Sequence, residues 1–236
     1  MDFDLRANWN NFVEKKKGQA YEKIDEFLTD LEHRYKAEKI EEFERAGANH
    51  NDAVVKARQS WVVYVGKSLE RIVEMIIEPL VVQHGAKMAS DKEIKKRALG
   101  KEMDCVRRAI LVHFDGSSQL PDADLIVYRY DEKIEKVFIV AILSMKNSFR
   151  ERYTETPYWK LKLMQSEITR GIKVYMVTTD RDDEISSSTR PSKARVVLEY
   201  ELDGVYITKN KNEFGATDKV GDINALLKDL KELLVR

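Results

Sequence analysis

The sequence has a single cysteine, Cys105, so it can form no disulfide within the chain and cannot offer four cysteine ligands to zinc. It also lacks long apolar runs: the longest, residues 137–143 and 172–177, are far shorter than the about 20 residues of a spanning helix. No basic segment followed by an apolar run opens the chain. These absences predict a soluble, cytoplasmic protein with no membrane partner.

An excess of charge of one sign is missing too, since Lys and Arg together number 41 and so do Asp and Glu. This balance argues against a histone-like protein that holds nucleic acid through net positive charge alone. It is compatible with an enzyme that gathers basic residues into one cleft. No Gly-x-x-x-x-Gly-Lys-Ser/Thr phosphate loop occurs, so we expect no nucleotide cofactor.

The first third of the chain has the periodicity of helices. Between residues 18 and 47 apolar side chains recur mostly at three- and four-residue steps, which predicts an amphipathic helix. A second helix is expected, with Asn51 or Asp52 as its N-terminal cap and Pro79 as its end. At 236 residues, the chain fits one α/β domain with a helical elaboration, or two small domains.

The second half has the pattern of strands that alternate with helices. Residues 125–128, 137–143 and 172–177 are predicted strands, and a helix with Pro157 in its first turn separates the last two. Strand, helix and strand in this order indicate a parallel crossover unit. Residues 195–200 and 205–208 are predicted to form a hairpin, and Asp222 to cap a C-terminal helix. The predicted fold is α/β (α+β), a mixed central sheet flanked by helices with an N-terminal helical layer.

A basic stretch lies between residues 91 and 108, where seven basic side chains accompany four acidic ones. Two interpretations stay open, a surface that faces phosphates and a solvated helix face. The basic residues are Lys92, Lys95, Lys96, Arg97, Lys101, Arg107 and Arg108.

The residues that indicate chemistry stand at the ends of two predicted strands. Asp122 and Asp124 precede the first strand, and Ser144 and Lys146 end the next. Ser144 and Lys146 are two residues apart, so both point to the same face of the sheet. Hydrolysis of a phosphodiester needs a hard cation held by carboxylates, and a lysine can help to polarise water and phosphate. If the strands are neighbours, Asp124 and Lys146 meet at one rim.

The segment from Pro121 to Arg152 resembles the core of PD-(D/E)xK restriction endonucleases, in which a proline–aspartate pair precedes an acid-x-lysine motif on the next strand. The run Ser144-Met-Lys-Asn-Ser-Phe-Arg-Glu-Arg152 is similar to a Lys-x-Ser/Thr-x-x-x-Arg continuation in several members. Gly66-Lys-Ser-Leu-Glu70 is similar to a Gly-x-x-x-Glu helix that brings a further carboxylate to the metal in some relatives. These segments cover about a third of the chain.

The resemblance implies a restriction-endonuclease-like fold and a type II enzyme that uses Mg²⁺ to cut double-stranded DNA and leaves 5′-phosphates. Asp124 and Glu70 are the expected metal ligands, with the backbone carbonyl of Met145 completing the set. Lys146 is expected to orient the attacking water and to contact the scissile phosphate. Asp122 forms the literal proline–aspartate pair and is interpreted as a turn residue that assists Asp124.

One departure from the family pattern is Ser144, which stands where the motif has an acid. Glu70 is the first candidate for the replacement, because it already matches a family element. Glu151 and Glu155 come second, because they follow Lys146 closely. The alternative is a weakened or inactive site.

The resemblance also implies a homodimer, because a twofold protein can read a palindrome and cut both strands. Residues 1–50 are expected to form a helical region for dimerisation or DNA embrace, and residues 51–236 the nuclease core. Contact with DNA is assigned to the segment that follows the second strand, comprising Lys146, Asn147, Ser148, Arg150 and Arg152.

Three other functions are weighed against restriction. The first is a structure-selective nuclease of DNA repair or junction resolution, which uses a similar core. The second is a catalytically inactive, nuclease-like DNA-binding protein, which the substitution at Ser144 permits. The third, a structural helical adaptor, leaves the arrangement of Asp124, Lys146 and Glu70 without an explanation.

Overall fold

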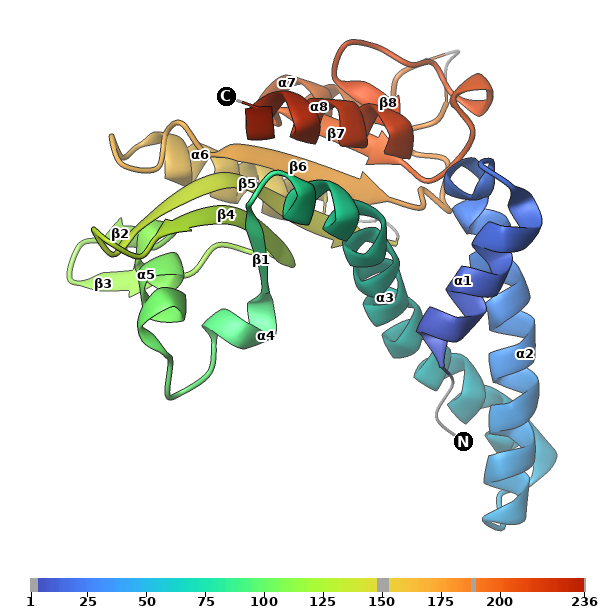
Figure 1. Cartoon of the computed structure of the whole chain (residues 1–236). Helices are drawn as coiled ribbons and strands as arrows, with labels where there is room; N and C mark the ends of the chain where they lie inside the picture. The colour runs from blue at the N-terminus through green and yellow to red at the C-terminus, as the bar shows by residue number, and fades with distance from the viewer. Residues whose placement is uncertain (1–3, 148–152, 188–189, 236) are drawn as a thin grey trace.

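A six-stranded mixed sheet forms the centre of the protein, whose computed structural model describes residues 4–147, 153–187 and 190–235 (Figure 1). The strand order is β1-β4-β5-β6-β7-β8. β4 is antiparallel to β1 and β5, whereas β5, β6, β7 and β8 are parallel. The strands are β1 Lys87–Ser90, β4 Leu125–Asp131, β5 Lys136–Lys146, β6 Lys173–Thr178, β7 Gly204–Ile207 and β8 Val220–Asp222. A separate hairpin pairs β2 Val112–Phe114 with β3 Ser117–Gln119.

Helices cover both faces of this sheet, and α2 and α3 extend beyond it as a long hairpin (Figure 1). Within the described part of the chain, no helix is both long and apolar enough to cross a membrane. The helices are α1 Leu5–Lys16, η1 Ala20–Lys23, α2 Ile24–Arg45, α3 His50–Gln83, α4 Asp91–Ile94, α5 Lys101–Ala109, α6 Glu155–Met164, α7 Lys193–Glu201, η3 Lys211–Glu213 and α8 Ile223–Val235.

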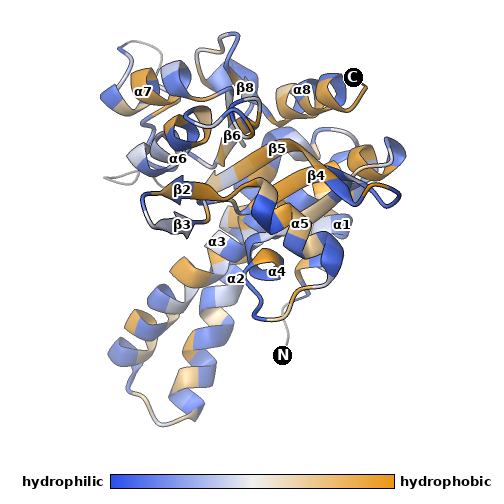
Figure 2. Cartoon of the chain, turned by 90° about the vertical axis from the view of Figure 1, so that its left-hand side faces the viewer, coloured by the Kyte–Doolittle hydropathy of each residue, from blue (hydrophilic) through white to orange (hydrophobic). Residues whose placement is uncertain are grey.

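Alternation along the strands divides the buried side chains between two clusters, one on each face of the sheet. On β5, Leu143 and Met145 pack in the cluster that includes α1, α2, α3 and α8, whereas Ile142 packs in the cluster that includes α5, α6 and α7. Figure 2 shows β4 and β5 as a mostly apolar centre between helices. Ser144 and Lys146 lie in the register of Ile142 and therefore face α6.

Local signals explain several element boundaries. Asn49 caps α3 by accepting a hydrogen bond from the backbone N–H of Asp52, 2.9 Å away. Gly85, with φ +66°, turns the chain from α3 into β1 in a conformation that favours glycine. Asp222 caps α8 by accepting the N–H of Ala225 at 2.9 Å, as the sequence predicted. The predicted mixed sheet, the parallel β5–α6–β6 crossover and the N-terminal helical layer are confirmed.

The predicted end of the second helix at Pro79 is wrong, because α3 continues to Gln83. Pro79 is exposed, and Ile77 and Val81 on either side of it are fully buried. Their burial in the core holds the last turn of α3 although the proline supplies no N–H. The helix also starts earlier than expected, since its cap is Asn49.

The predicted hairpin of residues 195–200 and 205–208 is also wrong. Residues 193–201 form α7, which Ser192 caps by accepting the N–H of Arg195 at 3.0 Å. Ala194 and Leu198 are buried four residues apart, on one face of the helix. β7 runs parallel to β6, so the chain must cross over the sheet before β7 begins, and α7 provides this crossover.

Candidate active site

β4 begins and β5 ends at one rim of the sheet, because the two strands are antiparallel neighbours. Leu125, the first residue of β4, pairs with Leu143, so Asp124 precedes this pair and Ser144 follows it. The strand register thus brings the two aspartates of the 121–124 segment to the same place as Lys146. The antiparallel pairing of β4 with β5 is therefore enough to bring these aspartates close to Lys146.

Lys146 forms an ion pair with Asp122, whose Oδ2 lies 2.5 Å from the lysine Nζ. The Lys146 side chain is only 10% exposed, and Glu155 Oε2 lies 3.7 Å from the same ammonium group. Two carboxylates therefore face one nearly buried cation. Of the two acids that the sequence proposed behind the lysine, Glu155 lies beside Lys146, and Glu151 falls outside the described residues.

Ser144 stands where the family motif has an acid, and it is fully buried. Its hydroxyl donates to Asp122 Oδ2 over 3.3 Å and accepts from the hydroxyl of Thr156 on α6 at 3.0 Å. The carboxylate of Asp122 thus contacts both the hydroxyl of Ser144 and the ammonium of Lys146. An acid from the preceding segment lies beside the position where the motif acid is missing.

Asp124 has a different set of contacts. Its Oδ2 accepts the backbone N–H of Met145 at 2.6 Å, and its backbone carbonyl accepts the N–H of Asp91 at 3.4 Å. Burial raises the pKa of the Asp124 carboxyl, and the neighbouring charges of Asp122 and Asp91 act in the same direction. The hydrogen bond from Met145 and the charge of Lys146 only partly offset this rise.

Asp124 opens onto a cavity of about 400 Å³ between α3 and α4. Glu70 lines the cavity from α3, and its pKa is raised by burial and next by the charge of Asp124. The two carboxyl groups therefore repel one another in a partly buried place. The complete lining is Lys67, Glu70, Arg71, Glu74, Ser90, Asp91, Lys92, Glu93, Asp124 and Leu125.

Gly66, one turn before Glu70, lies close to the end of β5. A methyl group at Gly66 would reach 3.7 Å from the side-chain nitrogen of Asn147, which is ordinary contact. The amide oxygen of Asn147 is buried and has no hydrogen-bond partner among the described residues. Of the other positions assigned to DNA contact, Ser148, Arg150 and Arg152 lie outside the residues that the structure describes.

The cavity suits a hard divalent cation in its donor chemistry. Mg²⁺ typically keeps several waters and takes only one or two protein carboxylates together with substrate phosphates. Asp124 and Glu70 offer two carboxylates whose pKa values are raised mainly by burial and further by neighbouring negative charges. In the described part of the chain, no three His, Cys, Asp or Glu side chains converge on one metal position. The protein thus supplies a partial ligand set that water and phosphate oxygens can complete.

Sequence reasoning missed Asp91 as a member of this group. It was counted as one acid of a basic stretch, whereas pairing of β1 with β4 places it against Asp124. Its carboxylate forms an ion pair with Lys95 at 2.6 Å. The short segment before Asp91, Ala86-Lys-Met-Ala-Ser90, has no strand pattern strong enough to identify a site.

A mixed sheet whose rim combines Asp122, Asp124 and Lys146 with a helix-borne glutamate defines a restriction-endonuclease-like protein of the PD-(D/E)xK class. Two solved structures share the fold over 98% of this chain, both at 13% identity. The restriction endonuclease PspGI in complex with substrate DNA is covered over 93% of its chain with a TM-score of 0.59. The pre-specific BsaWI–DNA complex is covered over 91% with a TM-score of 0.50.

Sequence comparison is more specific. Residues 92–230, more than half of the chain, match the family of BsaWI restriction endonuclease type 2. A protein of Methanocaldococcus jannaschii, provisionally named as the type II restriction enzyme MjaVIP, is 39% identical over 89% of this chain and 92% of its own length. HpyAORF263P of Helicobacter pylori, with a provisional name of the same kind, is 40% identical over 73% of this chain and 88% of its own length. This chain belongs to the BsaWI family of type II restriction endonucleases.

Proposed function

We propose that the chain is a Mg²⁺-dependent type II restriction endonuclease that hydrolyses double-stranded DNA at a specific sequence and leaves 5′-phosphates. The observation that supports this most directly is the meeting of Asp124 and Lys146 at one rim, with Glu70 across the cavity from Asp124. The relatives named as type II restriction enzymes, and the two neighbours in complex with DNA, support the same substrate.

In the proposed reaction, water attacks phosphorus, the bond from phosphorus to the 3′ oxygen breaks, and the products are a 5′-phosphate and a 3′-hydroxyl. Asp124 and Glu70 would hold Mg²⁺, with the carbonyl of Met145 as a further candidate ligand. The bound cation would supply charge stabilisation and polarise water and phosphate. Lys146 contacts the scissile phosphate and orients the water from the neighbouring strand end. Partial burial strengthens these electrostatic contacts.

Asp122 and Glu70 together replace the acid that is absent at Ser144, and each takes a different role. Asp122 holds Lys146 in place through the 2.5 Å ion pair and hydrogen-bonds to Ser144. Glu70 supplies the second charge beside Asp124, which is the replacement that the sequence favoured. This division makes Asp122 a positioning residue and Asp124 the main metal ligand.

DNA contact by Asn147, Ser148, Arg150 and Arg152 is part of the same proposal, because these residues follow Lys146 closely in the sequence. A homodimer is the proposed assembly, since two copies can cut the two strands of a palindrome. The proposed boundary of the N-terminal region at residue 50 falls on the first residue of α3. A role of residues 1–50 in dimerisation or DNA embrace stays a proposal.

The test is incubation of the purified protein with unmethylated plasmid and phage DNA, with Mg²⁺ and with EDTA, beside Lys146→Ala. Discrete fragments that need Mg²⁺ and disappear in the variant are the expected result, and end-labelling then identifies 5′-phosphates. The matched control is Lys228→Ala, which removes an exposed lysine from α8.

Two other outcomes would redirect the assignment. Intact linear and plasmid DNA together with cleavage of branched DNA would indicate a structure-selective nuclease. Binding of duplex DNA without cleavage of any substrate would indicate a nuclease-like binding protein. Either result would overturn the proposal of a restriction enzyme.

A further inference from the structure

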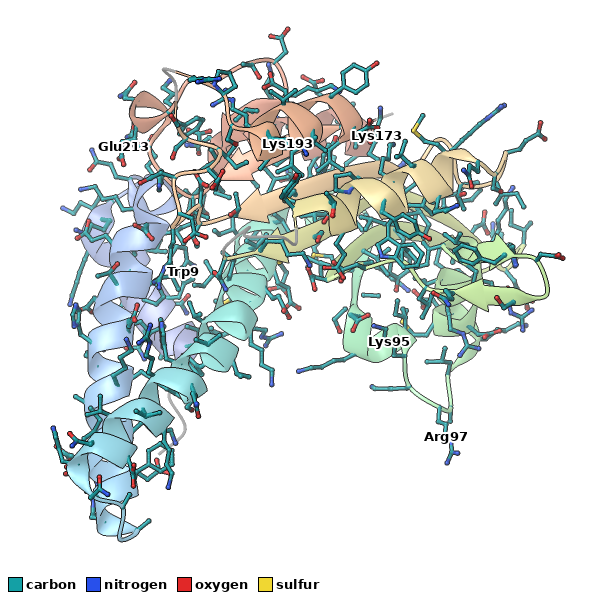
Figure 3. All side chains as sticks on the ribbon, turned by 180° about the vertical axis from the view of Figure 1, so that it is seen from behind. Trp9, Lys95, Arg97, Lys173, Lys193 and Glu213 are labelled. Atoms are coloured by element: carbon teal, nitrogen blue, oxygen red, sulfur yellow. The ribbon has the colours of Figure 1, made fainter. Side chains whose placement is uncertain are left out.

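The wall of the cavity opposite α3 continues into a basic projection. We call α4 and the connection to α5, residues 91–100, the basic arm. Its four basic side chains, which are all exposed, are Lys92, Lys95, Lys96 and Arg97. Figure 3 shows Arg97 at the outer end of the basic arm, on the side of the sheet towards which the α2–α3 hairpin also extends (Figures 1 and 2).

The base of this arm is anchored to the site. Glu93 Oε2 accepts hydrogen bonds from both the backbone N–H and the hydroxyl of Ser90, each at 2.7 Å. Ile94 is fully buried in the cluster beneath the sheet. The N–H of Asp91 donates to the carbonyl of Asp124. These contacts fix residues 91–94 relative to Asp124, and Lys96 and Arg97 follow this anchored segment directly in the chain.

Most neighbouring cations have acidic partners within the fold. Lys95 pairs with Asp91 on the basic arm itself. On α5, Lys101 pairs with Glu135, while Arg107 and Arg108 both pair with Asp104.

Lys96 and Arg97 differ from these residues. Within the described ranges, neither has a hydrogen bond or an ion pair to a protein group, and both are exposed. Their charges therefore do not contribute to the fold through any described contact. Lys92 on the same arm lines the cavity, and Lys96 and Arg97 follow it four and five residues later without lining it.

We propose that the basic arm binds the phosphate backbone of DNA beside the scissile bond, with Lys96 and Arg97 as its main contacts. This inference rests on the proposed function and adds where the duplex runs as it leaves the cavity. Because α4 is helical as far as Ile94, the chain from Lys92 to Arg97 reaches at most about 14 Å. Successive phosphates of one strand rise about 3.4 Å along the duplex axis, so this length faces several of them. Lys67 on α3 and Lys92 then stand on opposite walls of the cavity.

The experiment measures how DNA affinity depends on salt for the full-length chain and for Lys96→Ala/Arg97→Ala. The probes are two short duplexes of equal length, one with the sequence that the wild type cuts and one without it, both in EDTA so that no cleavage occurs. Neutralising two phosphate contacts should reduce the slope of log affinity against log salt by about 2 on both duplexes. We expect affinity to fall roughly tenfold near 0.15 M salt.

Two control variants separate a local contact from general charge. Lys228→Ala/Lys231→Ala removes the same charge from exposed positions of α8, away from the cavity, and should keep the wild-type slope. Lys96→Arg/Arg97→Lys keeps the charge of the basic arm and should also keep it. In Mg²⁺, the alanine variant should cut the same sequence with an unchanged kcat and a raised KM.

A wild-type slope in Lys96→Ala/Arg97→Ala, or an equal change in the α8 variant, would overturn the inference. Loss of kcat at saturating DNA would also contradict it, because the basic arm is proposed to bind DNA and not to react. Failure of the wild type to cut any DNA would count against the proposed function alone. The slope measured on the duplex without the site would still test the basic arm.

Discussion

The two opposite rims of the central sheet carry different charge clusters. At the rim where β6 begins, which we call the Asp203 end, Asp203 lies between two lysines. At the rim where β4 begins and β5 ends, the Asp124 end, Asp124 and Glu70 face one cavity together. Asp203 accepts from Lys160 at 2.6 Å and from Lys173 at 2.9 Å, near the start of β6. Burial opposes its ionisation, yet the hydrogen bonds from Lys160, the N–H of Val174 and Lys173 hold its pKa below the usual value. Burial is the main cause that raises the pKa of Asp124 and the pKa of Glu70. The charges of Asp122 and Asp91 add to the rise at Asp124, and the charge of Asp124 adds to the rise at Glu70.

The difference distinguishes a structural cluster from the cluster that we propose to bind metal, although both are made of the same residue types. Lys160 also donates to the carbonyl of Ile172 at 2.9 Å, so its cluster ties α6 to the start of β6. At that rim each charged group has an opposite charge in contact, because the carboxylate of Asp203 pairs with both lysines. The Asp124 end has more negative than positive charge in contact, which favours a cation or a proton. Natural proteins tolerate such unfavourable sites where function depends on them.

The largest expected effect is on catalysis at the Asp124 end. Lys146→Ala should lower the single-turnover cleavage rate by about 10²- to 10³-fold, as expected for a lost group that stabilises transition-state charge. DNA affinity in EDTA should change little by comparison. Cleavage by this variant at the wild-type rate would remove Lys146 from the site.

At the opposite end of the sheet, Asp203→Asn should destabilise the protein by about 3 kcal/mol, because Lys160 is left as a nearly buried charge without its carboxylate. Urea denaturation at constant protein concentration measures this change. The fraction that stays folded should cut DNA with the wild-type kcat. A selective fall in kcat without loss of stability would contradict the structural role.

Mg²⁺ should stabilise the folded protein by binding at the Asp124 end and not at the Asp203 end. With Mg²⁺ at tenfold its Kd, the wild type should gain about 1.4 kcal/mol in its free energy of unfolding. Glu70→Gln should reduce this gain, and Asp203→Asn should keep it. An equal gain in wild type and Glu70→Gln would show that Glu70 is not a ligand.

Without metal, Asp124→Asn should raise stability by about 1 kcal/mol at neutral pH, since it removes a repelled charge and keeps an acceptor for the N–H of Met145. The same variant should lose cleavage. Thermal unfolding in EDTA gives the stability change, and a destabilised variant would mean that the carboxylate is not strained in the folded state.

The smallest effect is the pH dependence, which has opposite signs at the two ends. Asp124 and Glu70 have raised pKa values in the folded state, so their stabilising contribution is present below the unfolded pKa and is lost as the pH rises through the folded pKa. Asp203 has a lowered pKa, so its contribution is present above the unfolded pKa and is lost as the pH falls through the folded value. Urea denaturation in EDTA across acidic pH, with Asp124→Asn and Asp203→Asn, should reveal two slopes of opposite sign.

Much of the fold was predictable because periodicity acts over short distances. The strands around residues 125, 140 and 175 and the helix after Asp222 followed from runs of apolar residues and one cap. Two predictions failed where the deciding contact was distant. The β-branched residues of α7 favoured a strand, but pairing of β7 with β6 required a crossover helix. Pro79 indicated a helix end, but burial of Val81 extended α3.

The sequence alone determined which residues were candidates, since Asp122, Asp124 and Lys146 stand at strand ends that neighbouring strands bring together. Tertiary structure decided their contacts. It paired Asp122 with Lys146 and placed Glu70 of α3 on the same cavity as Asp124. It also brought the N–H of Asp91 to the backbone carbonyl of Asp124. These groups lie between about 20 and 60 residues apart in the chain, and no local pattern encodes their distances. The packing of a long helix across one sheet rim decides them, because only the assembled core sets where that helix lies.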